Sequence, residues 1–257
     1  MSRLIASTMT HSTYDLAGAL EKLKEAGFEK VELCSAGALA PHLDVTDITT
    51  FMVAETARIV RESGMGVHCL NIGGDYSLAQ MELVYALAGE LGAGIVTYSC
   101  GSPKEGVPVE DSLRYHAEFN SKLADIGEKY GVTCSIEAPH KYSLASTTAE
   151  VDRYWSMQDD RVRVTFDTAH LTFSGEDMLA LARRYARRMA HSHLRDAVRG
   201  NSLLRYGEGQ VDFGSYISIV KDGGYQGLFS MEYPSDSAED AREKLDSSVR
   251  FLSRFNI

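Results

Sequence analysis

The segment VRVTFDTAH, at residues 162–170, reads as a buried strand that ends in Asp167 and His170, two residues able to bind metal. Three other apolar segments also deliver a carboxylate or an imidazole near their carboxyl end, namely CSIEAPH (134–140), MAHSHLRD (189–196) and LFSMEYP (228–234). β-Branched and aromatic residues dominate these segments, which is typical of strands. The four segments therefore predict parallel strands whose carboxyl ends share one pocket.

Strand and helix patterns alternate along the whole chain in units of roughly 30 residues, the scale of a βα repeat. Eight segments have strand character, at residues 4–9, 30–35, 66–72, 94–100, 132–138, 162–168, 189–195 and 227–233. Apolar residues spaced three and four apart predict helices between them, for example at 13–28, 47–64, 76–92 and 109–131. Eight such units predict an α/β fold, a closed (β/α)₈ TIM barrel, with residues 1–257 as a single domain. The competing six-strand Rossmann-like sheet lacks a GxGxxG turn opening a helix.

Composition disfavours nucleic acid and membranes as partners. The 257 residues are 44% hydrophobic and carry a formal net charge of -10, so polyanions are repelled on average. The first residues turn polar too soon for a signal peptide, and no stretch approaches the roughly 18 apolar residues of a membrane span, which predicts a cytoplasmic protein. Four cysteines without a CxxC pair lie in separate predicted strands, as expected of reduced core residues: Cys34, Cys69, Cys100 and Cys134.

The strand ends together predict a site for one divalent cation. In a (β/α)₈ barrel the carboxyl ends of all strands converge on one face, so residues far apart in sequence can hold one ion. The expected ligands are Glu137, Asp167, His193 and Glu232, from four neighbouring strands. Three carboxylates and one imidazole favour Mn²⁺, with Mg²⁺, Co²⁺ or Fe²⁺ as alternatives, over a structural zinc site. No P-loop or dinucleotide motif indicates a nucleotide cofactor.

The same ligand set predicts proton transfer on a small carbohydrate. Open positions on the ion could chelate two oxygens of an α-hydroxy carbonyl compound, which would acidify the adjacent carbon-bound proton. Glu137 and Glu232 come from strands separated by two others, so they could flank the substrate, one removing a proton and the other returning it. This arrangement predicts isomerisation or epimerisation of a small sugar or keto-polyol through an enediolate intermediate.

Two alternative functions stay open. An enolised intermediate with a leaving group on the next carbon can lose that group, so the same apparatus could serve a dehydratase or a lyase that cleaves a C-glycoside. A protein of another class, a non-catalytic sugar-binding or partner subunit, would keep the barrel and its ligands without turnover.

Several motifs in this chain carry a family resemblance: IEAPH (136–140), FDTAH (166–170), HSHLRD (191–196), GEGQVDF (207–213) and GYQGLFSMEYP (224–234). Together they resemble the xylose-isomerase-like TIM barrel superfamily of sugar-phosphate isomerases, epimerases and endonuclease IV relatives. The resemblance implies that the four ligands named above bind the metal and that both glutamates transfer protons. It also implies that His170 contacts a substrate oxygen and that Arg199, six residues after His193, orients it.

Departures from the family pattern limit the reaction that can be inferred. Ketose 3-epimerases of this superfamily carry a second glutamate where this chain has Ser143. Inosose-dehydratase-like and hydroxypyruvate-isomerase-like members remain compatible. His140 and Lys141 stand in the altered segment and are candidates for substrate contact, although His140 could instead be a polar residue of the lip. Endonuclease IV needs extra histidines for three metals, and Leu203 occupies one of their expected positions, which argues against DNA repair.

Other features have more than one interpretation. His68 on the third strand could reach the pocket floor and contact substrate, or it could be a core histidine. Glu32 on the second strand could reach the same floor, or lie at the rim. The connection at 196–210 is long enough to serve the substrate. The basic run at 183–188 predicts a solvated helix face or, alternatively, a contact in a homo-oligomer.

Overall fold

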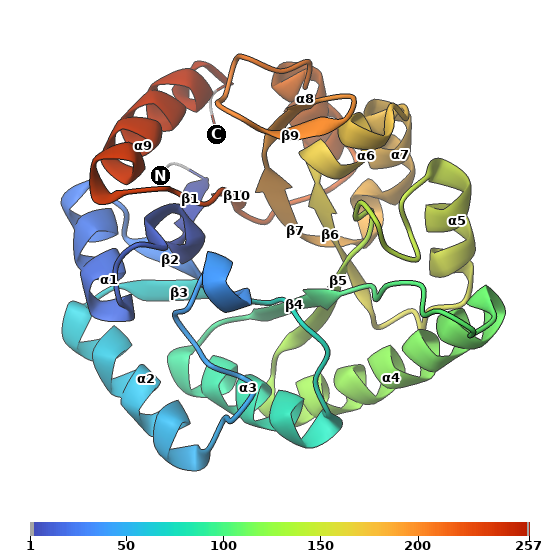
Figure 1. Cartoon of the computed structure of the whole chain (residues 1–257), viewed down its shortest axis with the longest axis horizontal. Coiled ribbons are helices and arrows are strands. Elements are labelled where there is room, and N and C mark those ends of the chain that lie inside the picture. Colours follow the sequence, from blue (N-terminus) through green and yellow to red (C-terminus); the bar gives the residue numbers. More distant parts are fainter. Residues whose placement is uncertain (1–2, 256) are drawn as a thin grey trace.

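The computed structural model describes residues 3–255 and 257, and its centre is a closed barrel of eight parallel strands (Figure 1). Neighbouring strands follow the order β1-β10-β7-β6-β5-β4-β3-β2 around the barrel. The barrel strands are β1 (Leu4–Ser7), β2 (Lys30–Ser35), β3 (Gly66–Ile72), β4 (Ile95–Ser99), β5 (Thr133–Glu137), β6 (Arg163–Asp167), β7 (Met189–Leu194) and β10 (Phe229–Met231). The (β/α)₈ fold expected from the sequence is confirmed.

Helices form a ring outside the barrel (Figure 1). They are α1 (Leu16–Glu25), α2 (Thr50–Ser63), α3 (Leu78–Leu91), α4 (Val109–Tyr130), α5 (Thr148–Ser156), α6 (Thr168–Ser174), α7 (Met178–Tyr185), α8 (Phe213–Asp222) and α9 (Ala238–Leu252). Short 3-10 helices are η1 (Thr8–His11), η2 (Gly37–Leu39), η3 (Ala186–Arg188) and η4 (Ser253–Phe255). Capping boxes at Ser77 and Thr147 begin α3 and α5. No helix among the described residues is long and apolar enough to cross a membrane.

The two sides of the barrel wall differ in polarity, because alternate residues of a strand point to opposite sides. On β2, Val31 and Leu33 belong to the apolar core between barrel and helices, whereas Glu32 contacts a histidine inside the barrel. Hydroxyl groups also pair in the interior, where Oγ1 of Thr165 lies 2.8 Å from Oγ1 of Thr97. All four cysteines are buried and free of disulfides, as expected. The barrel interior therefore contains polar side chains that hydrogen-bond to one another.

The long connection after β7 contains a two-stranded antiparallel hairpin, β8 (Asp196–Val198) and β9 (Asn201–Leu204), which the sequence patterns did not predict. The chain after the hairpin wraps around the carboxylate of Asp196, which accepts hydrogen bonds from the backbone amides of Gly207 (2.8 Å) and Gly209 (2.9 Å). A Cβ on Gly209 would lie 2.1 Å from Oδ1 of Asp196, so only glycine fits there. The GEG motif thus forms a turn whose backbone amides bind the carboxylate of Asp196.

Candidate active site

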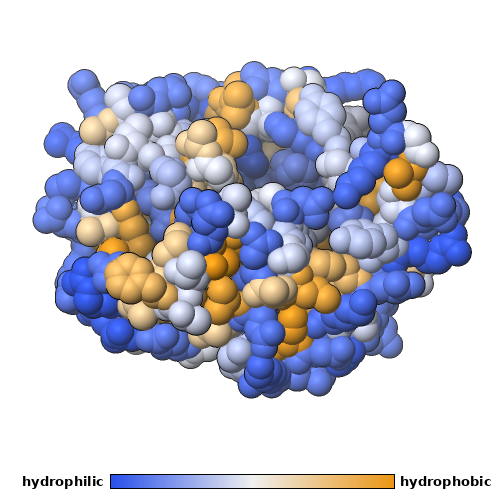
Figure 2. Space-filling view, turned by 60° about the horizontal axis from the view of Figure 1, so that its bottom comes forward, coloured by the Kyte–Doolittle hydropathy of each residue, from blue (hydrophilic) through white to orange (hydrophobic). Residues whose placement is uncertain are grey.

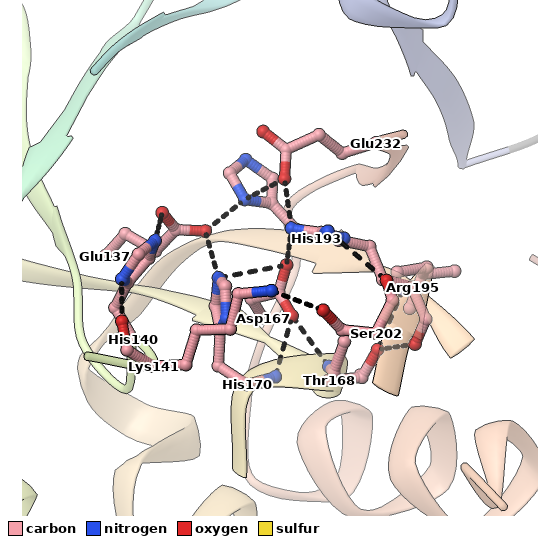
Figure 3. A network of polar contacts seen from close by, with 12 residues as sticks. Glu137, His140, Lys141, Asp167, Thr168, His170, His193, Arg195, Ser202 and Glu232 are labelled. Carbon is pink, nitrogen blue, oxygen red and sulfur yellow. Dashed lines mark hydrogen bonds and ion pairs between the residues drawn. The ribbon is translucent and has the colours of Figure 1, made fainter. Parts of the chain in front are cut away.

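The four expected metal ligands come from adjacent strands of the barrel. Glu137 is the last residue of β5, Asp167 is the last residue of β6, His193 lies on β7, and Glu232 directly follows β10. These strands are neighbours in the order β10-β7-β6-β5, and Asp167 lies opposite His193 in the β6–β7 register. Because parallel neighbours end together, the four side chains meet at the barrel mouth (Figure 3).

His193 is the centre of this cluster (Figure 3). Its Nδ1 atom lies 2.8 Å from Oε1 of Glu137 and 3.4 Å from Oε2 of Glu232. One ligand atom from each of the four residues lies within 4.8 Å of the other three. Ligands on opposite sides of one small divalent ion are separated by about 4 Å, twice a metal–oxygen distance of about 2.1 Å. The cluster therefore has the dimensions of a single-ion site.

Asp167 gives an independent test of whether a cation fits. Its Oδ1 accepts hydrogen bonds from the backbone amides of Ala169 (2.6 Å) and His170 (3.2 Å), at the start of α6. Its Oδ2 is buried and has no hydrogen-bond partner. Burying a carboxylate oxygen without a partner is costly. A divalent ion bound by Oδ2, together with the other three side chains, would satisfy it.

Glu32 supports the cluster from the opposite side of the His193 ring. It is fully buried, and its Oε2 lies 3.0 Å from Nε2 of His193 and 2.5 Å from Nε2 of His191. A carboxylate that accepts the Nε2 proton of His193 leaves Nδ1 with a free lone pair that faces the cluster, an arrangement typical of metal-binding histidines. The sequence left open whether Glu32 reaches the pocket floor or lies at the rim, and the structure places it in the barrel interior.

Asn71 is a second supporting residue that sequence reasoning missed. It lies on β3, and its side-chain amide donates a hydrogen bond of 2.6 Å to Oε1 of Glu232. The same amide is 3.5 Å from Oε1 of Glu32. Asn71 therefore orients Glu232, and no metal-ligand pattern marks such a residue in the sequence.

Burial and charge shift the two glutamates of the cluster in opposite directions. Burial raises the pKa of Glu232 to about 8, and the charges of Glu137 and Glu32 add to the rise against opposition from His193 and Arg195. Burial also acts to raise the pKa of Glu137, but its hydrogen bond to His193 and the charge of that ring outweigh burial and lower it. The same three glutamates raise the pKa of His193, although burial opposes the change. The cluster thus holds one carboxylate inclined to stay ionised and one inclined to hold a proton.

Arg195 is the arginine that lies at this cluster, whereas the expected Arg199 lies elsewhere, so a substrate role for Arg199 stays a prediction. The side chain of Arg195 is 14% exposed, and its Nη1 lies 3.5 Å from Oε2 of Glu232 and 3.6 Å from Oδ2 of Asp167. Arg199 lies in the turn of the β8–β9 hairpin and packs over Gly175 at the end of α6. None of the contacts that the structure shows joins Arg199 to the four-residue cluster. Alternation along MAHSHLRD could have identified Arg195, since residues 191, 193 and 195 share one face of a strand.

His170, His140 and Lys141 line the other side of the cluster (Figure 3). Nε2 of His170 lies 3.8 Å from both Glu137 and Asp167, and neither ring nitrogen has a hydrogen-bond partner. The His140 ring packs on the His170 ring, with centroids 4.0 Å apart. Nζ of Lys141 lies 2.5 Å from the Ser202 hydroxyl, which joins the β5–α5 loop to β9. Two of the expected substrate-binding residues, His170 and His140, are thus beside the cluster.

His68, the remaining expected substrate contact, lies deeper in the barrel. It is near the amino end of β3, and its ring packs against that of His191 at a centroid distance of 5.6 Å. Its Nε2 is buried without a hydrogen-bond partner. Among the described contacts, none joins His68 to the four-residue cluster, so a substrate role for His68 stays a prediction.

The fold and the site together define a (β/α)₈ barrel with a candidate metal-ligand cluster at its mouth. The chain belongs to the family described as the xylose isomerase-like TIM barrel, whose model matches residues 20–255.

Curated relatives of known activity match the chain over part of their length. An inosose dehydratase of Clostridium perfringens is 27% identical over 148 residues, which cover 50% of this chain and 50% of that protein. The rhizopine catabolism protein MocC of Rhizobium meliloti is 33% identical over 172 residues, which cover 63% of this chain and 50% of MocC. The chain thus spans about half the length of the curated relatives it matches.

Solved structures match over nearly the whole fold. The 3-keto-D-glucoside 4-epimerase YcjR of E. coli superposes with a TM-score of 0.77 at 16% identity, covering 98% of this chain and all of that one. IolI with a bound zinc atom superposes with a TM-score of 0.74 at 17% identity, covering 99% of each chain. These likenesses show a shared fold.

Proposed function

We propose that this protein is a divalent-metal-dependent enzyme that moves a proton on the carbon next to the carbonyl group of a small keto sugar or keto polyol. One observation carries the proposal: the carboxylates of Glu137 and Glu232 approach the same atom of His193, at 2.8 and 3.4 Å, from strands separated by two others. A divalent ion held by Glu137, Asp167, His193 and Glu232 would polarise the carbonyl and acidify the neighbouring carbon-bound proton.

The protein's own residues have distinct tasks in this proposal. Glu137 and Glu232 lie on either side of His193, so one carboxylate can accept the proton and the other can return it. Arg195 can donate hydrogen bonds to a substrate oxygen, because its guanidinium lies at the cluster without a short hydrogen bond to either carboxylate. His170 is buried with both ring nitrogens unpartnered, so it can position a second oxygen.

Dehydration is the second candidate outcome, and the inosose dehydratases among the relatives favour it. Removal of the same proton followed by loss of hydroxide from the next carbon gives elimination, whereas return of the proton gives isomerisation or epimerisation. Elimination needs a further proton donor for the leaving hydroxide. His140, whose Nε2 lies 3.8 Å from Oε2 of Glu137, and the adjacent Lys141 are the residues to test for that task (Figure 3).

The experiment that tests the proposal is exchange of solvent deuterium into a panel of ketoses, aldoses and inososes by protein loaded with Mn²⁺ or Co²⁺. We expect exchange in the wild type and its loss in Glu137→Gln and Glu232→Gln, with Glu62→Gln, exposed on α2, as the matched control. Mass analysis of the products separates the two outcomes, because only elimination removes water. Unimpaired exchange in either active-site variant would defeat the proposed roles.

A further inference from the structure

A cavity of about 150 Å³ adjoins the four-residue cluster. Arg195 and Glu232 form its inner wall, and the chain from Ser202 to Tyr206 and the segment from Tyr233 to Asp236 form its sides. Ser202 and Leu204 belong to β9, and Lys244 and Ser248 of α9 close the far end. Because Glu232 belongs both to the cluster and to this wall, a molecule bound at the cluster can extend into the cavity.

The part of the cavity between Tyr206, Tyr233, Leu204 and Pro234 offers ring faces and aliphatic groups, whereas charged residues line the rest. The hydroxyl of Tyr206 donates to the backbone carbonyl of Leu194 at 2.5 Å, and the hydroxyl of Tyr233 accepts from Ser248 at 3.3 Å. The two tyrosine rings meet edge to face, with centroids 6.0 Å apart. Leu204 and Pro234 complete this surface. Such a lining favours a flat or weakly polar ring.

The charges around the cavity disfavour an anionic group. The loops after the seventh and eighth strands of α/β barrels often bind phosphate, together with the start of a nearby helix. Two of the cations in that region are paired closely: Arg205 lies 2.9 Å from Glu243, and Lys244 lies 2.8 Å from Asp240. The third, Arg195, faces the carboxylates of Glu232 and Asp167 at the four-residue cluster. The first turn of α9 carries Glu239 and Asp240, so a phosphate would meet carboxylates there.

The size of the cavity defines the size of the guest. An engineered apolar cavity of about 150 Å³ in another protein admits benzene. The cavity beside Glu232 has a similar volume, so it has room for one six-membered ring.

We propose that this cavity is a subsite for an uncharged ring attached to the reacting sugar, so that the substrate is a glycoside or similarly ring-substituted keto sugar without a phosphate. The inference rests on the proposed function for the placement of the reacting carbonyl at the four-residue cluster. The attached ring lies between Tyr206, Tyr233 and Leu204.

The test compares the methyl and phenyl β-glycosides of 3-ketoglucose in the deuterium-exchange assay. Burial of an aryl ring should raise kcat/KM for the phenyl compound by about tenfold or more. Leu204→Trp fills the cavity and should lower kcat/KM for the phenyl glycoside at least about tenfold more than for the methyl glycoside. The control is Leu39→Trp, at an exposed position on η2, which should leave the preference unchanged. Equal rates for both glycosides, or equal losses in Leu204→Trp, would overturn the proposal.

A binding measurement separates failure of the subsite from failure of the proposed function. Phenyl β-D-glucopyranoside has no ketone and cannot exchange a proton, so its binding, followed by calorimetry or saturation-transfer NMR, reports the cavity alone. We expect it to bind the wild type and Leu39→Trp and to lose at least about tenfold in affinity in Leu204→Trp. Binding that is absent, or equal in all three proteins, rejects the subsite whether or not any keto sugar reacts.

Discussion

The side-chain amide of Asn71 donates a hydrogen bond of 2.6 Å to Oε1 of Glu232, so a residue of β3 orients a carboxylate that follows β10. Asn71→Leu removes the donor and leaves a buried oxygen without this partner, at a cost of about 1–3 kcal/mol. We expect deuterium exchange to fall by about 5-fold to 100-fold. The matched control is Thr97→Val on the neighbouring strand, which removes a polar group of the barrel interior whose hydroxyl pairs with Thr165 and not with Glu232. Equal losses in both variants would show that the effect is structural.

Glu32 should control metal affinity without being a ligand. Its carboxylate contacts Nε2 of His193 at 3.0 Å, and replacing such a partner of a ligand typically weakens metal binding by about 10-fold to 100-fold. We expect that loss in Glu32→Gln, measured by titration with Co²⁺ and its visible absorption spectrum. Glu62→Gln provides the exposed control. An unchanged affinity in Glu32→Gln would contradict the supporting role.

Arg195 and Arg199 form a matched pair for testing which arginine serves the substrate. Arg195 lies 3.5 Å from Glu232, whereas Arg199 packs over Gly175. Hydrogen bonds from a charged donor contribute about 1.5–3 kcal/mol, so Arg195→Met should lower kcat/KM by about 10-fold to 100-fold. Arg199→Met should change it by less than about threefold. The opposite ranking would favour the family-based expectation for Arg199.

Metal should stabilise the folded protein through Asp167. A ligand present at 100 times its Kd stabilises the native state by about 2.7 kcal/mol. We expect added Mn²⁺ or Co²⁺ to raise the melting temperature of protein treated with a chelator, and Asp167→Asn to reduce that rise. A melting temperature of the wild-type protein that does not change on addition of Mn²⁺, Co²⁺ or Mg²⁺ would contradict the single-ion site.

His68 should make the protein less stable in acid. Burial, reinforced by the charge of His191, lowers the pKa of His68 from 6.5 to about 4. In the unfolded chain His68 therefore binds a proton near pH 6.5, whereas in the folded protein it binds one only near pH 4. The folded state loses stability as the pH falls from 6.5 to 4. The loss is about 2 kcal/mol at pH 5. Urea denaturation of the wild type and of His68→Asn gives the free energy of unfolding at pH 7 and at pH 5. The decrease between pH 7 and pH 5 should be smaller for the variant. An equal decrease in both proteins would show that another group causes the acid sensitivity.

The positions of the strands and the proximity of the four expected ligands could both be predicted from the sequence, for the same reason. Each donor is preceded by a short apolar segment, and a closed parallel barrel brings all the carboxyl ends to one face. Figure 2 shows the corresponding hollow, bordered mainly by hydrophilic residues. That these residues bind a cation stays a prediction.

The residues that support the donors were harder to predict, because their role depends on which way a strand residue points. Glu32 and Asn71 lie within apolar strands, and only the register of the closed barrel shows that they face His193 and Glu232. The position of Arg199 was hard to predict for a related reason. The hairpin of β8 and β9 turns its tip toward α6, a geometry that no local pattern in the segment predicts.

The supporting residues Asn71 and Glu32 and the four expected ligands lie in different halves of the barrel, which has an evolutionary consequence. Three of the four expected ligands lie on β5, β6 and β7 and the fourth directly follows β10, while both orienting residues lie on β2 and β3. Recombination that replaced only the first half of the barrel would leave all four expected ligands in place. It would still change the pKa values and the orientation of their side chains. The reactivity proposed for this site can therefore be changed by substitutions in the first half of the barrel, which contributes none of the four expected ligands.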